Sequence, residues 1–263
     1  MHRLGSVLSL ARATLSEALR DRILYGLVLF AIGLILLSAV LSNLTVGYRV
    51  RIVTDLSLSA MTFAGMILAV LLGVGSVARE VERRTAYSIL AKPVGRAEYV
   101  VGKYLGVLLT SYLNLLLMTV AATAMILLYR SEGGFMYSWG AYATTLGLML
   151  LRVAVVAAVA VMFSTFTSST VSFIASLGFS VAGYFTSEVR FFLGKSESEA
   201  TRLLGDVLYW FLPDFAALDT LPQLLYSHPI LTGPVVAAIV YALCYIALLL
   251  VLATAIFRRR DLA

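Results

Sequence analysis

The chain has 263 residues, of which 61% are hydrophobic and 13% charged, roughly half the charged share of a soluble domain. This composition excludes a soluble core, and the continuous apolar runs differ from the alternating pattern of a membrane β-barrel. The net charge is +6, yet no soluble basic face carries aromatic residues among its charges, so no nucleic-acid partner is expected.

Residues 1–22 predict an amphipathic helix that lies in the membrane interface. Apolar residues recur at helical spacing, and most of the charged side chains lie on other faces. The apolar positions are Leu4, Val7, Leu8, Ala11, Leu15, Ala18 and Leu19. An ordinary soluble tail helix is the alternative.

Six apolar runs then predict six transmembrane helices, because about 20 residues cross about 30 Å of hydrocarbon as a helix. The fifth run is the shortest. The runs are Ile23–Leu41, Leu58–Val77, Tyr104–Leu128, Ala141–Phe163, Val171–Ser187 and Pro234–Phe257. We therefore expect one all-α integral membrane domain over residues 1–263.

The distribution of Lys and Arg predicts the orientation of these helices. If both termini are cytoplasmic, thirteen of these residues lie inside, six lie outside and Arg152 lies within a span. This bias follows the positive-inside rule, so cytoplasmic termini are expected.

The loop over residues 79–103 carries six of the twenty Lys and Arg residues. Its charged start comprises Arg79, Glu80, Glu82, Arg83, Arg84 and Thr85. Pro93 is expected to break the helical path, and Gly95 to Glu98 reads as a new helix start whose glutamate reaches back to the first amides. The pattern predicts a helix, a break and a helix that could contact a soluble partner, although the charges could serve topology alone.

Arg152 lies in the middle of the fourth apolar run, where a charge must face protein or water. It could touch an anionic substrate, pair across a dimer seam or find a structural partner. A later start of the span would instead let it reach the interface. Ser172, Ser176 and Ser180 form a ridge of small residues in the fifth run, which could line a translocation path or a dimer seam, or serve ordinary helix packing.

Residues 188–233 are rich in Leu and aromatic residues and predict an extracytoplasmic helical segment. We expect amphipathic helices over Ser198–Phe211 and Phe215–Tyr226, separated by Pro213. The segment could cover the outer mouth of the protein or simply pack at the interface. Within the six spans there is no nucleophile–base pair and no metal-ligand spacing, so neither an intramembrane enzyme nor a metal site is expected.

Several motifs together resemble one family. They are Glu80, Glu82 and Thr85, then Pro93 and Arg96, then Gly102 and Lys103; the stretch Leu212-Pro213-Asp214-Phe215 with Leu218-Asp219; and the ending Arg258-Arg259-Arg260-Asp261-Leu262. In this order and in these loops they resemble the permease subunits of ABC-2 type transporters, in the branch of small six-span proteins. Arg84 stands where many members have glycine, and Gly95 where many have serine.

The resemblance implies an exporter transmembrane domain in the inner, cytoplasmic membrane, paired as two copies with two copies of a separate ATPase subunit. ATP and Mg would bind to that partner, because this chain lacks the phosphate-binding motif G-x-x-x-x-G-K-[ST] and would hold no cofactor. Loop 79–103 would couple the two subunits. The expected coupling residues are Arg79, Glu80, Glu82, Arg83, Arg84, Thr85, Pro93 and Arg96.

The substrate stays open among lipid, polysaccharide, peptide, drug and sulfur species of a metal pathway. An accessory protein on the periplasmic face would be a further partner. The alternative function is a membrane anchor that docks a soluble protein without transport. A passive channel is less expected, because only Arg152 and the serines offer polar groups along a span.

Overall fold

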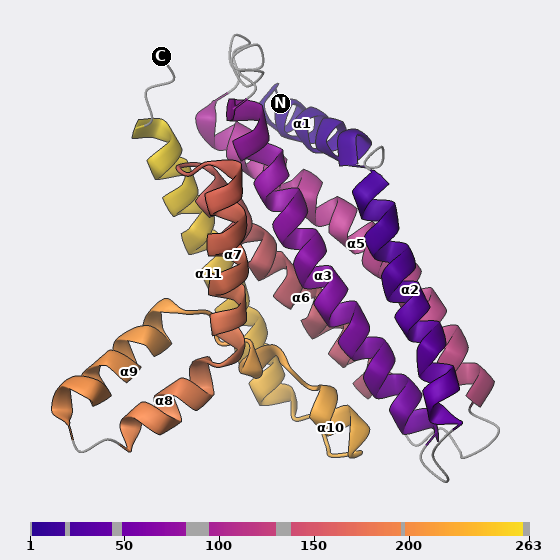
Figure 1. Ribbon diagram of the computed structural model, residues 1–263. Helices are drawn as coiled ribbons and strands as arrows, with labels where there is room; N and C mark the ends of the chain where they lie inside the picture. The colour runs from indigo at the N-terminus through magenta and orange to yellow at the C-terminus, as the bar shows by residue number, and fades with distance from the viewer. Residues whose placement is uncertain are drawn as a thin grey trace.

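The computed structural model describes residues 2–18, 22–43, 49–82, 95–129, 138–195 and 198–259 (Figure 1). Its regular structure in these ranges is entirely helical. The elements are α1 (His2–Ala18), α2 (Arg22–Ser42), α3 (Arg49–Glu82), α5 (Arg96–Tyr129), α6 (Trp139–Ser164), α7 (Ser169–Tyr184), α8 (Thr186–Gly194), α9 (Glu199–Phe211), the 3-10 helix η2 (Ala216–Leu218), α10 (Leu221–Leu225) and α11 (Thr232–Arg259).

Five of the described helices are long and apolar enough to cross a membrane, namely α2, α3, α5, α6 and α11. The fifth predicted run, Val171–Ser187, is not one straight helix, and α7 with α8 makes a sixth candidate span only if the bent pair is one span. Helix α7 ends at Tyr184 after 16 residues and is followed by α8 at an angle of 60°. Sixteen residues rise only about 24 Å as a helix, which is less than the hydrocarbon thickness. Taken together, α7 and α8 are a broken span or a re-entrant loop.

Helices α3 and α6 form the centre of the bundle and pack closely against each other. A Cβ atom added at Gly73 would lie 2.5 Å from the Cβ atom of Ala160, and one added at Gly65 would lie 3.1 Å from the side chain of Val153. Small residues therefore let these two backbones approach, as expected where packing rather than the hydrophobic effect drives helix association in lipid.

Helix α1 lies against α5 at the end of the bundle where the last turn of α11 also lies, which we call the terminal end (Figure 1). Gly102 and Gly106 form the groove, since a Cβ atom at these positions would lie 2.9 Å from Leu10 and 2.5 Å from Thr14. The face of α1 that is buried comprises Leu10, Ala11, Thr14 and Ala18. Leu8, which the sequence placed on the apolar face, is exposed. The buried stripe follows the glycine groove, which the pattern of α1 alone does not encode.

Helices α8 and α9 form a hairpin that projects sideways from the bundle near the end of α7 (Figure 1). After this hairpin the chain returns to the junction of α7 and α8. The Thr186 hydroxyl donates to the Pro213 carbonyl at 3.2 Å, and the Phe215 amide donates to the Gly183 carbonyl at 3.2 Å. Residues 213–225, the return segment, continue along α6 toward the end opposite the terminal end, which we call the far end.

The predicted helix over Phe215–Tyr226 is wrong, because η2 and α10 are separate and Asp219 and Thr220 lie between them. The predicted helix over Ser198–Phe211 is confirmed as α9, which ends before Pro213. Helix α8 was not predicted.

Candidate functional site

The first candidate site lies at the terminal end, where the charged loop joins α3 to α5. Helix α3 continues to Glu82, so Arg79, Glu80 and Glu82 belong to its last turn, although their side chains lie outside the described part of the chain. Arg83, Arg84, Thr85 and Pro93 also lie outside the described residues. Their expected role in coupling stays a prediction.

The start of α5 is built as the sequence predicted. The Gly95 amide donates to Oε2 of Glu98 at 3.4 Å, which is the reach-back of a glutamate at the third helical position. The prediction that a helix begins here is confirmed.

Arg96 ties this helix start to the last turn of α11. Its Nη1 donates to the Phe257 carbonyl at 3.2 Å and also to the Arg258 carbonyl. These carbonyls belong to the last turn, which has no intrahelical partners and carries the negative end of the helix dipole, so a guanidinium stabilises them. Tyr99 stacks on Phe257 one turn further along α5, with the ring centroids 5.5 Å apart. The flank of the loop is thereby coupled to α11, which the sequence did not predict.

The second candidate site surrounds Arg152, whose side chain is only 6% exposed. Its Nη2 donates to the Leu218 carbonyl at 2.8 Å and lies 3.4 Å from Oδ1 of Asp219. Its Nη1 donates to the Tyr184 hydroxyl at 3.4 Å, and the guanidinium lies 5.3 Å from the centre of that ring. Among the alternatives for this buried charge, the structure shows a partner within the same chain.

The position of the Arg152–Asp219 ion pair along α6 shows how far the return segment reaches into the bundle. Arg152 lies 13 residues after Trp139, so it is about 20 Å along α6 from the far end. The return segment therefore enters the middle of the bundle and does not remain wholly beyond it. Irregular backbone at membrane depth must have its polar groups satisfied by protein or water. Arg152 satisfies the Leu218 carbonyl in this way.

Other polar groups hold the beginning of the return segment. The Asp214 carboxylate accepts from the Ser187 hydroxyl at 3.2 Å and from the Ala216 amide at 3.0 Å. The Asp214 amide donates to the Tyr241 hydroxyl of α11 at 3.0 Å. Phe215 is fully buried. The Leu-Pro-Asp-Phe stretch thus anchors the chain between α7 and α11.

Ser172, Ser176 and Ser180 are fully buried in the isolated chain. With Gly183 they make up the buried face of α7, and α7 contacts α3 and α6. Within the described part of the chain, the Ser176 and Ser180 hydroxyls have no hydrogen-bond partner. Their expected place on a translocation path or dimer seam stays a prediction.

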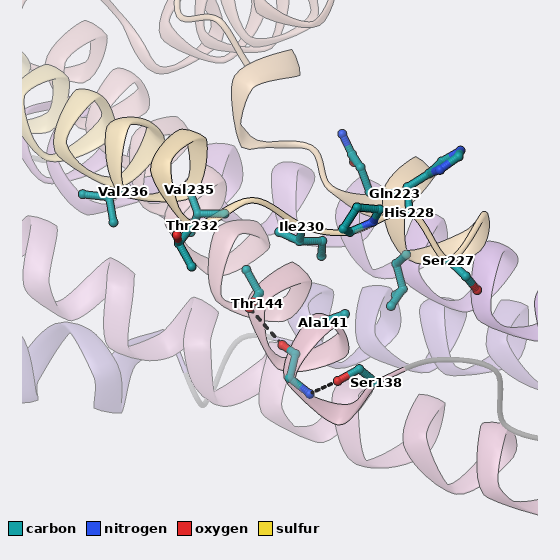
Figure 2. Close-up of a pocket in the computed structure, with 13 residues that line it drawn as sticks. Ser138, Ala141, Thr144, Gln223, Ser227, His228, Ile230, Thr232, Val235 and Val236 are labelled. Atoms are coloured by element: carbon teal, nitrogen blue, oxygen red, sulfur yellow. Dashed lines mark hydrogen bonds between the residues drawn. The ribbon is translucent and has the colours of Figure 1, made fainter.

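A cavity of about 600 Å³ opens at the far end. Figure 2 shows Ala141 and Thr144 of α6, with its N-cap residue Ser138, on one side of the cavity. Gln223, Ser227, His228 and Ile230 lie on another side, with Thr232, Val235 and Val236 of α11 beside them. A smaller cavity of about 270 Å³ adjoins it and is lined by Asp219, Thr220 and Gln223 among others. No group of three or more His, Cys, Asp or Glu side chains among the described residues could hold a metal ion.

The family model of the ABC-2 family transporter protein matches residues 8–262. The chain belongs to the ABC-2 transporter family. As such it is a multi-pass membrane protein and the translocation component of an ABC transporter, which is not itself catalytic. Its all-helical bundle fits the membrane domain of this family. No curated protein matches the chain.

Sequence reasoning missed two partners of Arg152 within this ABC-2 domain. Asp219 was quoted only as part of a motif and Tyr184 was not singled out, yet both contact Arg152. The Leu218-Asp219 dipeptide is the available signal, because an acid in a largely apolar segment is a natural partner for a lone intramembrane arginine.

Proposed function

We propose that this ABC-2 protein forms one half of a translocation path, completed by a second copy of itself and driven by two copies of a separate ATPase subunit. The observation that carries the proposal is the family match over residues 8–262, which takes in nearly all of the chain. The sequence has no phosphate-binding G-x-x-x-x-G-K-[ST] motif, so ATP and Mg would bind to the partner. Export is the proposed direction, by analogy with the family.

The proposed orientation places both termini in the cytoplasm and the far end outside the cytoplasmic membrane. The Lys and Arg distribution supports it, with thirteen of these residues inside and six outside. Helix α1 would then lie on the inner membrane surface beside α5, and the α8–α9 hairpin would lie on the outer side.

Loop 79–103 is the proposed coupling element. Its flanks are α3, which lies at the centre of the bundle, and α5, which contacts α1 along Gly102 and Gly106 and α11 through Arg96. A displacement of the loop by the ATPase would therefore reach α1, α3, α5 and α11 together. These contacts support a rigid lever at the terminal end.

The proposal is tested by purifying the chain from lipid with the ATPase subunit encoded beside its gene. The mass of the complex and its ATP hydrolysis in lipid vesicles are measured. A complex with two copies of each subunit that hydrolyses ATP is the expected result. A chain that binds another soluble protein and no ATPase would overturn the proposal in favour of a membrane anchor.

A further inference from the structure

We propose that the return segment, residues 213–225, is a movable strap on the outer half of the bundle and that the Arg152–Asp219 ion pair is its latch. The inference rests on the proposed function, since a latch matters only in a protein that changes conformation. The strap is the element of this chain that opens toward the far end.

The strap is held to the bundle by a few polar contacts and also by apolar side chains, since Leu218 and Leu224 are fully buried. Arg152 binds Leu218 and Asp219, and the Thr220 hydroxyl donates to the Thr145 hydroxyl of α6 at 3.1 Å. These contacts lie along about two turns of α6. Loss of these polar contacts would loosen the middle of the strap, residues 219–223, without unpacking a spanning helix.

The two partners of the ion pair have unequal surroundings. Arg152 is 6% exposed, whereas the Asp219 side chain is 37% exposed and lines the cavity of about 270 Å³. This cavity and the larger one in Figure 2 share Gln223, Pro229, Ile230 and Val235. Asp219 can therefore exchange Arg152 for water on the cavity side. A carboxylate that is hydrated avoids the free-energy cost of burying an unpaired charge, so Asp219 can leave Arg152 at low cost.

Arg152 keeps contacts when Asp219 leaves. The ring and hydroxyl of Tyr184 belong to α7 and do not move with the strap. A cation over an aromatic ring retains part of its stabilisation. The latch thus has a closed state with the ion pair and an open state with a hydrated acid and an arginine held by Tyr184.

The beginning of the strap is fixed in place. Phe215 is fully buried, and its ring centre lies 5.2 Å from that of Tyr184. The Asp214 amide is bound to Tyr241. Leu224 is fully buried at the other end of the strap. The strap therefore opens between these two anchors, along Asp219 to Gln223, into the space that the cavities provide.

The first test measures access to the strap in the ABC-2 chain alone, reconstituted in lipid vesicles. Cys244 is replaced by serine, and Thr220→Cys is introduced as a reporter, because Thr220 is buried beside the ion pair. The rate of reaction with a water-soluble maleimide is compared with and without Asp219→Asn. Asp206→Asn is the matched control, because Asp206 pairs with Arg190 on the exposed hairpin.

Asp219→Asn is expected to raise the labelling rate about tenfold, and Asp206→Asn to leave it unchanged. Labelling of the Asp219→Asn protein at the parent rate would overturn the proposal. An equal rise with Asp206→Asn would also overturn it, because the effect would then be general loosening.

The second test closes the strap covalently and does not depend on the folding of a charge variant. Thr145→Cys and Thr220→Cys are combined in the Cys244→Ser chain, since the two native hydroxyl oxygens are 3.1 Å apart. In complex with the ATPase subunit, the oxidised protein is expected to hydrolyse ATP in lipid about tenfold more slowly and to recover on reduction. An oxidised complex as active as the reduced one overturns the latch. Absence of any ATPase complex overturns the proposed function alone, and the labelling test then decides the strap.

Discussion

The ring of Tyr99 in α5 stacks on the ring of Phe257 in α11, with an angle of 13° between the two ring planes. Arg96 lies one turn earlier and donates to the carbonyl of the same Phe257. The first turns of α5 and the last turn of α11 are therefore one mechanical unit beside the charged loop.

Arg96→Met is expected to lower the free energy of unfolding by about 1–3 kcal/mol, because it leaves the last carbonyls of α11 without their charged donor. The measurement is a denaturant titration in mixed micelles. Arg202→Met, on the exposed face of α9, is the control and is expected to change little. Equal effects of the two substitutions would show that the Arg96 contact contributes nothing specific.

The spanning helices and the start of α5 could be predicted from local pattern. Apolar runs of spanning length, the Gly95–Glu98 signal and the break at Pro213 each lie within a few residues of the feature that they specify. The partner of Arg96 could not be predicted from local pattern, because it is a main-chain carbonyl 161 residues away and carbonyls have no sequence signature.

The partner of Arg152 was missed for a different reason. Asp219 lies in a segment that its polar and aromatic residues mark as an outer loop, yet that segment re-enters the bundle. The face of α1 that packs on α5 could not be predicted, because its register is chosen by Gly102 and Gly106 on another helix. In each case the deciding residue is distant along the chain.

Gly106→Leu is expected to displace α1 from α5. Even a Cβ atom there would lie 2.5 Å from the Cβ atom of Thr14 and 2.9 Å from the Ala11 carbonyl. Overpacking of this kind costs about 1–3 kcal/mol. Protease cleavage within α1 should become faster, whereas Gly33→Leu on α2, where no neighbouring atom lies within 4 Å of the added Cβ, should not change it. Unchanged cleavage of the Gly106 variant would contradict the packing of α1 in this groove.

Gly183→Ala is expected to unseat the beginning of the return segment. The added Cβ atom would lie 2.8 Å from the Pro213 carbonyl oxygen and 2.9 Å from the Phe215 ring, at a cost of about 1–3 kcal/mol. Gly178→Ala on the same helix meets no atom within 4 Å and should stabilise the protein by up to about 1 kcal/mol through helix propensity. Opposite shifts in melting temperature are the expected result, and parallel shifts would refute the close contact.

The unequal exposure of Arg152 and Asp219 predicts that removing one side chain lowers the free energy of unfolding more than removing the other. Asp219→Ala leaves a cation that is 6% exposed without its counter-ion and should cost about 2–4 kcal/mol. Arg152→Met removes the buried charge and leaves an acid that can hydrate from the cavity, so it should cost about 1–2 kcal/mol. Denaturant titration of both variants gives the order, and a larger cost for Arg152→Met would contradict this description of the pair.

The coupling role of loop 79–103 is tested most directly by ATP hydrolysis of the lipid-embedded complex with Glu82→Ala and Arg83→Ala combined. Arg190→Ala with Asp206→Ala is the matched control, since it removes one base and one acid from the exposed hairpin. The loop variant is expected to lose association with the ATPase or its stimulation by lipid, while the hairpin variant keeps both. A loop variant that associates and hydrolyses ATP like the unmodified chain would contradict coupling through this loop.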